Sequence, residues 1–147
     1  MAYLGQKHCM ELADVTKDSL CALIDDAMQT AQPDAVIVID ALAAAQPGRL
    51  LRTVQLADSG IVPGSGIGNS RQEFSSRTLG VPVIAVGVPT VISAGTLRGD
   101  PSQAGLIVTP SDIDARIAHM ARILAAGINR ALFPHLSEAE IAKLVAP

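Results

Sequence analysis

Spacing of apolar residues along the chain predicts three helices. Residues 15–30 place apolar side chains three and four positions apart, with Thr16 as the expected N-cap and Pro33 as the break after the helix. A Thr-Pro-Ser-Asp start at Thr109 introduces a longer helix over 111–132, and residues 137–144 form a final short one. The apolar face of the longer helix consists of Ile113, Ile117, Met120, Leu124 and Ile128.

Uninterrupted apolar runs predict the strands. Residues 35–39, 81–88 and 106–108 lack alternation, which is typical of strands buried on both faces of a parallel sheet. Residues 51–56 alternate weakly and indicate an edge or antiparallel strand, and residues 7–12 indicate a short strand that would complete a right-handed βαβ unit. We expect an α/β fold, a three-layer sandwich whose mostly parallel central sheet is flanked by helices.

Two connections are expected to be irregular. Residues 41–45 should begin a short helix that Pro47 and Gly48 stop. Residues 98–105 are polar and rich in turn formers, so they indicate a surface connection or the remains of a missing insertion.

Size and composition agree with one α/β domain over 1–147. The chain has 147 residues, 49% of them hydrophobic, with one Tyr, two Phe and no Trp. A core of Ala, Val, Ile and Leu suits close packing of helices on a sheet, which favours α/β over a β-sandwich.

Charge and cysteine content exclude several classes of function. A net charge of −3 provides no basic field for a nucleic-acid backbone. Cys9 and Cys21 have no metal-ligand or redox spacing, so we expect no metal and no cofactor. No apolar run approaches the roughly 20 residues that span a bilayer, and the N-terminus lacks signal-peptide regions. These features predict a cytoplasmic protein without a membrane or nucleic-acid partner.

Asp40 is the first candidate site residue, because it directly follows the apolar run 35–39. Its carboxylate must lie at the mouth of the sheet or be buried with hydrogen-bond partners, since burial without them would cost several kcal/mol. A structural capping role and a role in acid/base chemistry both fit this position.

Asp58 is the second candidate. Asp58-Ser59-Gly60 resembles the active-site triplet of pepsin-like and retroviral aspartic proteases, but those proteins are nearly all β. The helices predicted at 15–30 and 111–132 contradict that fold, so only the possible site role of Asp58 is kept.

A glycine-rich loop follows Asp58. Pro63 stands where a nucleophile elbow would have its first glycine, and no Lys follows as in a phosphate-binding loop. A loop whose glycines permit positive φ beside a site is the better interpretation. The candidate substrate-loop residues are Gly64, Ser65, Gly66, Gly68, Asn69 and Arg71.

Four ordered stretches together resemble the germination (spore) protease family: 33–43, 53–69, 79–91 and 108–110 with the helix that follows. The resemblance extends from about residue 15 to about residue 132. It implies an endopeptidase that degrades small acid-soluble spore proteins in the spore core. It also implies an oligomeric zymogen with a phosphorylase/hydrolase-like or hydrogenase-maturation-protease-like α/β fold. The family is regarded as using two aspartates, and Asp40 matches one of them.

Departures from the family pattern leave two hypotheses. The family's other aspartate lies in an upstream Thr-Pro-Asp-Ala-Leu-Gly type segment, and nothing before Asp34 resembles it. The chain thus resembles the C-terminal core of such a protease. One hypothesis is a peptidase whose second carboxylate comes from an N-terminal partner polypeptide or from Asp58. The other is a binding or scaffold subunit that keeps the fold without the chemistry. A small-molecule α/β enzyme using the glycine loop ranks third. Uncovered sheet surface should make the chain a homo-oligomer or hetero-oligomer.

Overall fold

The computed structural model describes residues 17–67 and 72–146. The expected strand at 7–12 and the expected cap at Thr16 lie outside these residues. The chain divides into two compact units. The first consists of Met1–Asp40 and Gln55–Gly87, and the second of Ala41–Val54 and Val88–Pro147.

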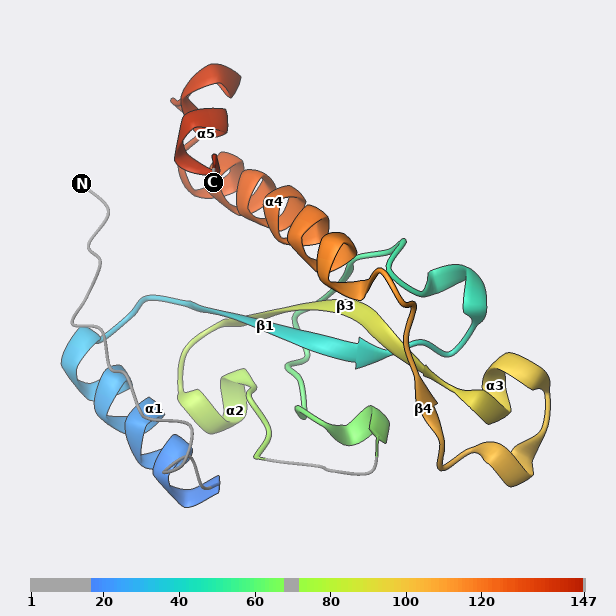
Figure 1. The fold of residues 1–147 in the computed structure, drawn as a ribbon. Coiled ribbons are helices and arrows are strands. Elements are labelled where there is room, and N and C mark those ends of the chain that lie inside the picture. Colours follow the sequence, from blue (N-terminus) through green and yellow to red (C-terminus); the bar gives the residue numbers. More distant parts are fainter. Residues whose placement is uncertain (1–16, 68–71, 147) are drawn as a thin grey trace. The chain divides into compact units, whose positions relative to one another are not determined.

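Four strands in the described part of the chain form a small mixed sheet (Figure 1). They are β1 (Val36–Ala43), β2 (Gln55–Ala57), β3 (Val83–Ser93) and β4 (Ile107–Val108). The order is β1-β3-β2, and β4 also pairs with β3. The Val36 N–H donates to the Pro82 carbonyl and the Ala44 N–H to the Val91 carbonyl, so β1 and β3 run parallel. Both β2 and β4 are antiparallel to β3.

The fold is therefore α/β, as expected. The prediction of a mostly parallel sheet is wrong, because both β2 and β4 pair with β3 in the antiparallel direction. Between β3 and β4 lie only the short helices α3 (Ala94–Arg98) and η4 (Pro101–Gln103). The Ala94 N–H donates to the Leu106 carbonyl at 2.7 Å, so the chain returns beside its own strand. A parallel return would need a longer crossover connection, usually built on a helix.

In the first unit, helix α1 (Lys17–Ala31) confirms the helix expected at 15–30. It ends before Pro33, with Gln32 at a φ of +43°. The prediction that the first strand is buried on both faces is wrong, because β1 alternates between half-buried and exposed positions. Ile37 is 37% exposed and Ile39 55% exposed. Central strand β3 is the buried one, with Val83, Ala85 and Val86 all in the core.

In the second unit, β3 does not end at Pro89 but continues to Ser93. Pro89 is fully buried, and its carbonyl accepts a hydrogen bond from the Leu51 N–H at 2.7 Å. The helix expected at 41–45 is also wrong, because β1 extends to Ala43. Pro47 instead occupies the first turn of a 3-10 helix, η2 (Pro47–Arg49).

The last strand of the second unit also differs from the expectation. Residues 106–108 were expected to form a buried strand, but the side chains of β4 and of Leu106 are exposed. Only two residue pairs join β4 to β3, Ile92 with Val108 and Ser93 with Ile107. An apolar run this short does not distinguish a buried strand from an exposed edge.

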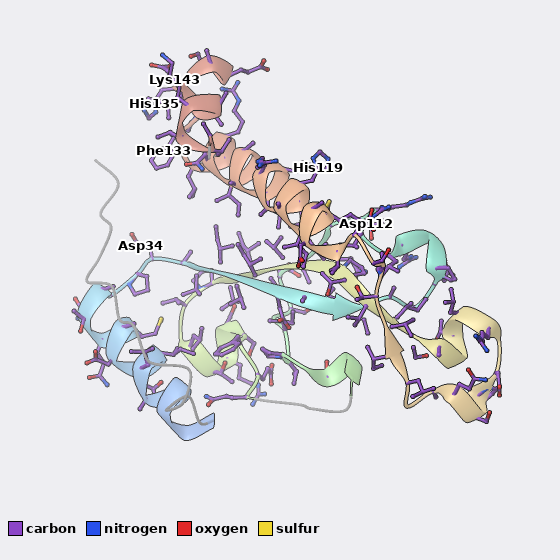
Figure 2. All side chains as sticks on the ribbon, in the orientation of Figure 1. Asp34, Asp112, His119, Phe133, His135 and Lys143 are labelled. Carbon is purple, nitrogen blue, oxygen red and sulfur yellow. The ribbon has the colours of Figure 1, made fainter. Side chains whose placement is uncertain are left out.

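Helices α4 (Ile113–Leu132) and α5 (Glu138–Leu144) confirm the two C-terminal helices. Asp112 and Phe133 mark the two ends of α4 in Figure 2. Met120 is buried against Leu51 and Val88, and Ile113 and Leu124 of the expected face pack against the same cluster. Ile117 was expected on this face but is 45% exposed. The Thr109 hydroxyl does not cap this helix, because it donates to the Thr90 carbonyl at 2.8 Å. No helix in the described ranges has an apolar stretch long enough to cross a bilayer.

Ser137 and Glu140 form a capping box at the start of α5. The Ser137 N–H and hydroxyl donate to the Glu140 carboxylate at 2.9 and 2.7 Å. The Ser137 hydroxyl accepts from the Glu140 N–H at 3.3 Å. These bonds, with the Ser137 hydroxyl first, lower the pKa of Glu140 below its ordinary value.

Because the folded-state pKa of Glu140 is lowered, the stabilisation is present above the ordinary glutamate pKa and is lost as pH falls through the folded-state value. Ser137→Ala should cost about 1 kcal/mol of helix stability at neutral pH. Hydrogen exchange at the Ile141 and Val145 amides should then become faster. The exposed Ser111→Ala is the control, and equal exchange rates in both variants would contradict a working capping box.

Candidate peptidase site

Asp40 lies within β1 rather than after its end, because the strand continues for three more residues to Ala43. Its side chain is half-buried, whereas its neighbours Ile39 and Ala41 are exposed. Strand alternation places Asp40 on the same face as Val36 and Val38. Regular backbone on both sides therefore fixes which face of the strand the Asp40 side chain leaves from.

Asp58 is exposed and directly follows β2. Strand β3 lies between β1 and β2, so the strand of Asp40 and the strand before Asp58 are not neighbours. Two strand spacings amount to about 10 Å. The sheet itself therefore does not bring the two predicted carboxylates together.

The glycine-rich loop is closed at its base by Ile61 and Phe74. Their backbones exchange two hydrogen bonds, of 2.9 and 2.8 Å. Gly64 has a φ of +74°, which confirms the expected positive φ at this glycine. Ser65 and Gly66 are exposed and begin the 3-10 helix η3 (Ser65–Ile67). The other predicted loop residues, Gly68, Asn69 and Arg71, lie outside the described residues.

Gly60 is a residue that sequence reasoning noticed only as part of the Asp-Ser-Gly triplet. Its φ is +87°, and a Cβ built on it would lie 2.4 Å from the Phe74 carbonyl oxygen and 2.6 Å from the Ser75 Cβ. Only glycine fits both the conformation and the close backbone approach. Gly60 thereby allows the base of the loop to close directly after Asp58.

The base of the loop also carries a charged pair. Glu73 accepts a hydrogen bond from the guanidinium of Arg77, four residues further along the chain. Arg77 lies in the short helix α2 (Ser76–Leu79), and Glu73 precedes that helix. Hydrogen bonding by the Ser75 side chain, followed by the Arg77 charge and its hydrogen bond, lowers the pKa of Glu73. This carboxylate is held in its charged form, which suits a structural ion pair better than a proton donor.

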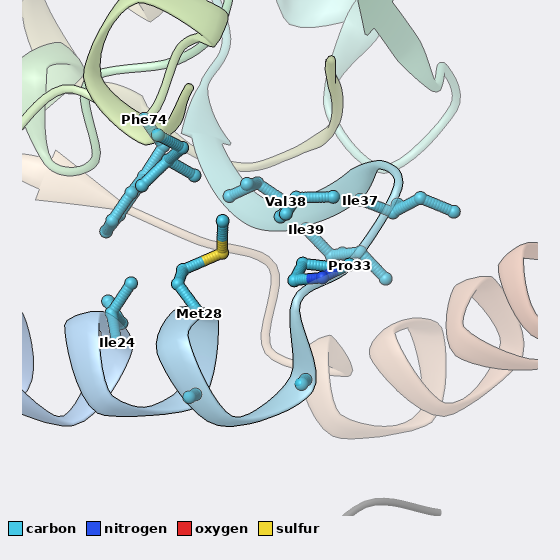
Figure 3. A pocket seen from close by; sticks show the side chains of 11 residues that line it. Ile24, Met28, Pro33, Ile37, Val38, Ile39 and Phe74 are labelled. Atoms are coloured by element: carbon cyan, nitrogen blue, oxygen red, sulfur yellow. The ribbon is translucent and has the colours of Figure 1, made fainter. Parts of the chain in front are cut away.

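An apolar cavity of about 430 Å³ lies in the first unit, between α1 and β1 (Figure 3). Ile24 and Met28 line it from α1, and Phe74 lines it from the base of the glycine loop. Its last lining residue on β1 is Ile39, which directly precedes Asp40. The cavity therefore ends one residue before Asp40 along β1, and its lining residues are all apolar. Sequence reasoning missed it, because it is formed by three segments that meet only in the fold.

No group of three or more His, Cys, Asp or Glu side chains suited to a metal ion occurs within residues 17–67 and 72–146.

Comparison with known proteins relates this arrangement to one family. A family model described as germination protease matches residues 14–104. The germination protease of Clostridium acetobutylicum is 37% identical over 163 residues, which cover 84% of this chain and 50% of that protein. That of Caldanaerobacter subterraneus subsp. tengcongensis is 34% identical, with 89% and 53% covered. That of Bacillus pumilus is 53% identical over 78 residues, which cover 53% of this chain and 21% of that protein.

The chain spans about half the length of the first two of these relatives. The alignment to the Clostridium acetobutylicum protein is also longer than the 147 residues of the chain. That relative therefore contains residues within the matched region that have no counterpart here. The family-model match ends at residue 104, inside the connection 98–105.

Proposed function

Because the chain belongs to the germination protease family, we propose that it is a peptidase subunit in which Asp40 is one of two catalytic carboxylates. The observation that carries this proposal is the position of Asp40. It lies inside the family-matched range, is half-buried on a regular strand, and directly follows Ile39, which lines an apolar cavity.

Two close carboxylates suit peptide hydrolysis. One takes a proton from the attacking water, and the other donates a proton to the leaving amine. The proposed reaction class is aspartate-based endopeptidase chemistry.

The second carboxylate is proposed to come from the half of the relatives that this sequence does not span, supplied by the same protein or by a partner polypeptide. Asp58 ranks second for this role, because β3 separates its strand from that of Asp40. A partner polypeptide in this role would make the assembled enzyme a hetero-oligomer.

The glycine-rich loop is proposed to contact the backbone of the protein substrate. Gly64, Ser65 and Gly66 are held by the closed base of the loop, and the latter two are exposed. By the family resemblance, the substrates are small acid-soluble spore proteins of the spore core. Gly68, Asn69 and Arg71 belong to the same proposed substrate loop.

A binding or scaffold subunit is the second candidate function. It is favoured by the strand order, in which β3 separates the strand of Asp40 from the strand before Asp58, the other predicted carboxylate. Such a subunit would keep the fold of the peptidase and bind its substrate or partner without cleaving it.

The purified chain alone is expected to cleave a small acid-soluble spore protein poorly. Loss of one general acid or base typically lowers the rate by roughly 10²–10⁴. Cleavage can be followed by mass spectrometry of the products, with a full-length germination protease as positive control. Cleavage by residues 1–147 alone at a rate comparable to the full-length enzyme would contradict the need for a second carboxylate from outside these residues.

A further inference from the structure

A groove in the second unit has no part in the proposed chemistry, because none of its lining residues is a candidate site residue. Helices α4 and α5 pack together through Ile141, which is buried. Between them is a cavity of about 590 Å³, lined on the α4 side by His119, Arg122, Ile123 and Gly127 among others. Figure 2 shows His119 on α4 and Lys143 on α5.

The floor of the groove is apolar and open. Its α4 positions recur three or four residues apart from His119 to Arg130, so they form one continuous face. These 11 residue steps span about 16 Å, or three helical turns. Ile123 is 47% exposed, and a Cβ added at Gly127 would meet no heavy atom within 4 Å. Another backbone can therefore approach α4 closely at Gly127.

The rim of the groove is cationic, because the arginines Arg122 and Arg130 outnumber the one acid in its lining, Glu138. His119 lies on the same side. Arg130 is fixed by donating a hydrogen bond to the Leu136 carbonyl at 2.6 Å. Within the described ranges, neither His119 nor Arg122 has an ion-pair partner. No acid occurs between residues 115 and 137, although the whole chain carries a net charge of −3.

This charge distribution selects the kind of partner. A symmetric contact between two copies would place one cationic rim against the other, which like-charge repulsion disfavours. An acidic partner removes that repulsion and complements Arg122. An amphipathic helix in an apolar groove is a recurring mode of recognition, with contacts at every third or fourth residue.

We propose that the groove between α4 and α5 binds an amphipathic helix of a partner protein, with an apolar stripe flanked by acidic residues. Apolar side chains of the partner contact Ile123 of α4 and Ala142 of α5, which are both exposed. Its carboxylates face Arg122 and His119 on the rim. This site is separate from the proposed peptidase chemistry and does not depend on it.

The probe is a fluorescein-labelled helical peptide of roughly 15 residues, long enough to cover the face. It carries Leu at every third or fourth position, Glu beside the Leu stripe and Ala elsewhere. Anisotropy should show saturable binding to the full chain that weakens as salt is added. An otherwise identical peptide with Lys in place of Glu should bind at least about tenfold more weakly. Equal binding of both peptides, or no binding of the Glu peptide, would overturn the proposal.

Arg122→Glu should weaken binding of the Glu peptide at least about tenfold through charge reversal. Arg98→Glu is the matched control, because Arg98 lies in the same unit on α3, outside the groove. It should change the dissociation constant less than about twofold, apart from the general effect of net charge. Equal loss in both variants would contradict a specific site.

Gly127→Leu tests the groove without weakening the helix. Leucine has a higher helix propensity than glycine and fills the open space at this position. Thermal stability should be unchanged or higher while peptide binding is lost. Retained binding would overturn the proposal, as would light scattering that shows a dimer of the chain dissociated by Arg122→Glu, because the occupant would then be a second copy.

Discussion

Asp40→Asn is expected to reduce cleavage of a small acid-soluble spore protein by at least about 10²-fold. The measurement is made with the chain mixed with a polypeptide carrying the N-terminal half of a full-length relative. Asparagine has nearly the same shape as aspartate but neither accepts nor donates the proton that peptide hydrolysis requires. Stability should change little, because the half-buried position keeps a polar side chain of the same size.

Asp34→Asn is the control for this substitution. Asp34 is exposed and lies two residues before the start of β1. The control therefore removes the same negative charge from a nearby position that has no proposed role in catalysis. Cleavage should be unaffected. The catalytic role of Asp40 would be contradicted if Asp40→Asn cleaved at the wild-type rate and lost only about 1 kcal/mol of stability, as expected for a capping residue.

Gly60→Ala is expected to lower the free energy of unfolding by about 3 kcal/mol or more. Two effects combine at this position. A φ of +87° strains any side chain, and the new Cβ would lie 2.4 Å from the Phe74 carbonyl oxygen. Relief of the overlap would have to open the Ile61–Phe74 hydrogen bonds at the base of the glycine loop. Denaturant unfolding measures this loss.

Two other glycines separate the effect of the positive φ from the effect of the close approach to Phe74. Gly80→Ala has the same type of strain, with φ at +73°, but no atom within 4 Å of the new Cβ. Gly48→Ala has neither the positive φ nor a close atom. Stability should fall most for Gly60, less for Gly80 and least for Gly48. A loss at Gly60 no larger than at Gly80 would show that the close approach to Phe74 does not matter.

The helices could be predicted from the sequence because their signals are local. Residues three and four apart marked the buried face around Met120, and the Ser137 start located the beginning of α5. Thr109 was mistaken for a cap, because a Thr-Pro pair is equally suited to a strand end whose hydroxyl bonds to a neighbouring strand. Element boundaries therefore shifted, while the existence of the helices did not.

The sheet could be predicted only in part, because burial of a strand depends on its place in the sheet. The apolar runs of β1, β3 and β4 look alike, yet only central β3 is buried along most of its length. Strand direction also depends on the connections. Nothing local in residues 94–106 distinguishes a crossover from the tight return that the structure has.

The candidate site shows the same division. Asp40 was identified because a carboxylate directly follows an apolar run. The end of the strand was placed too early, because residues 41–43 are compatible with helix or strand and β1 in fact continues to Ala43. The cavity beside Asp40 was missed, because Met28 and Phe74 meet there from segments far apart in the sequence. Separation of Asp58 from Asp40 by β3 follows from strand order, which no motif encodes.

The central claim is that this chain contributes one carboxylate of a two-carboxylate peptidase. It is tested most directly by the rate at which a small acid-soluble spore protein is cleaved by the chain with and without the N-terminal half of the Clostridium acetobutylicum relative. We predict a rate increase of at least about 10²-fold on mixing, and no such increase when the added half lacks its own aspartate. An unchanged rate, with binding of the two polypeptides shown by light scattering, would contradict the claim and favour a non-catalytic subunit.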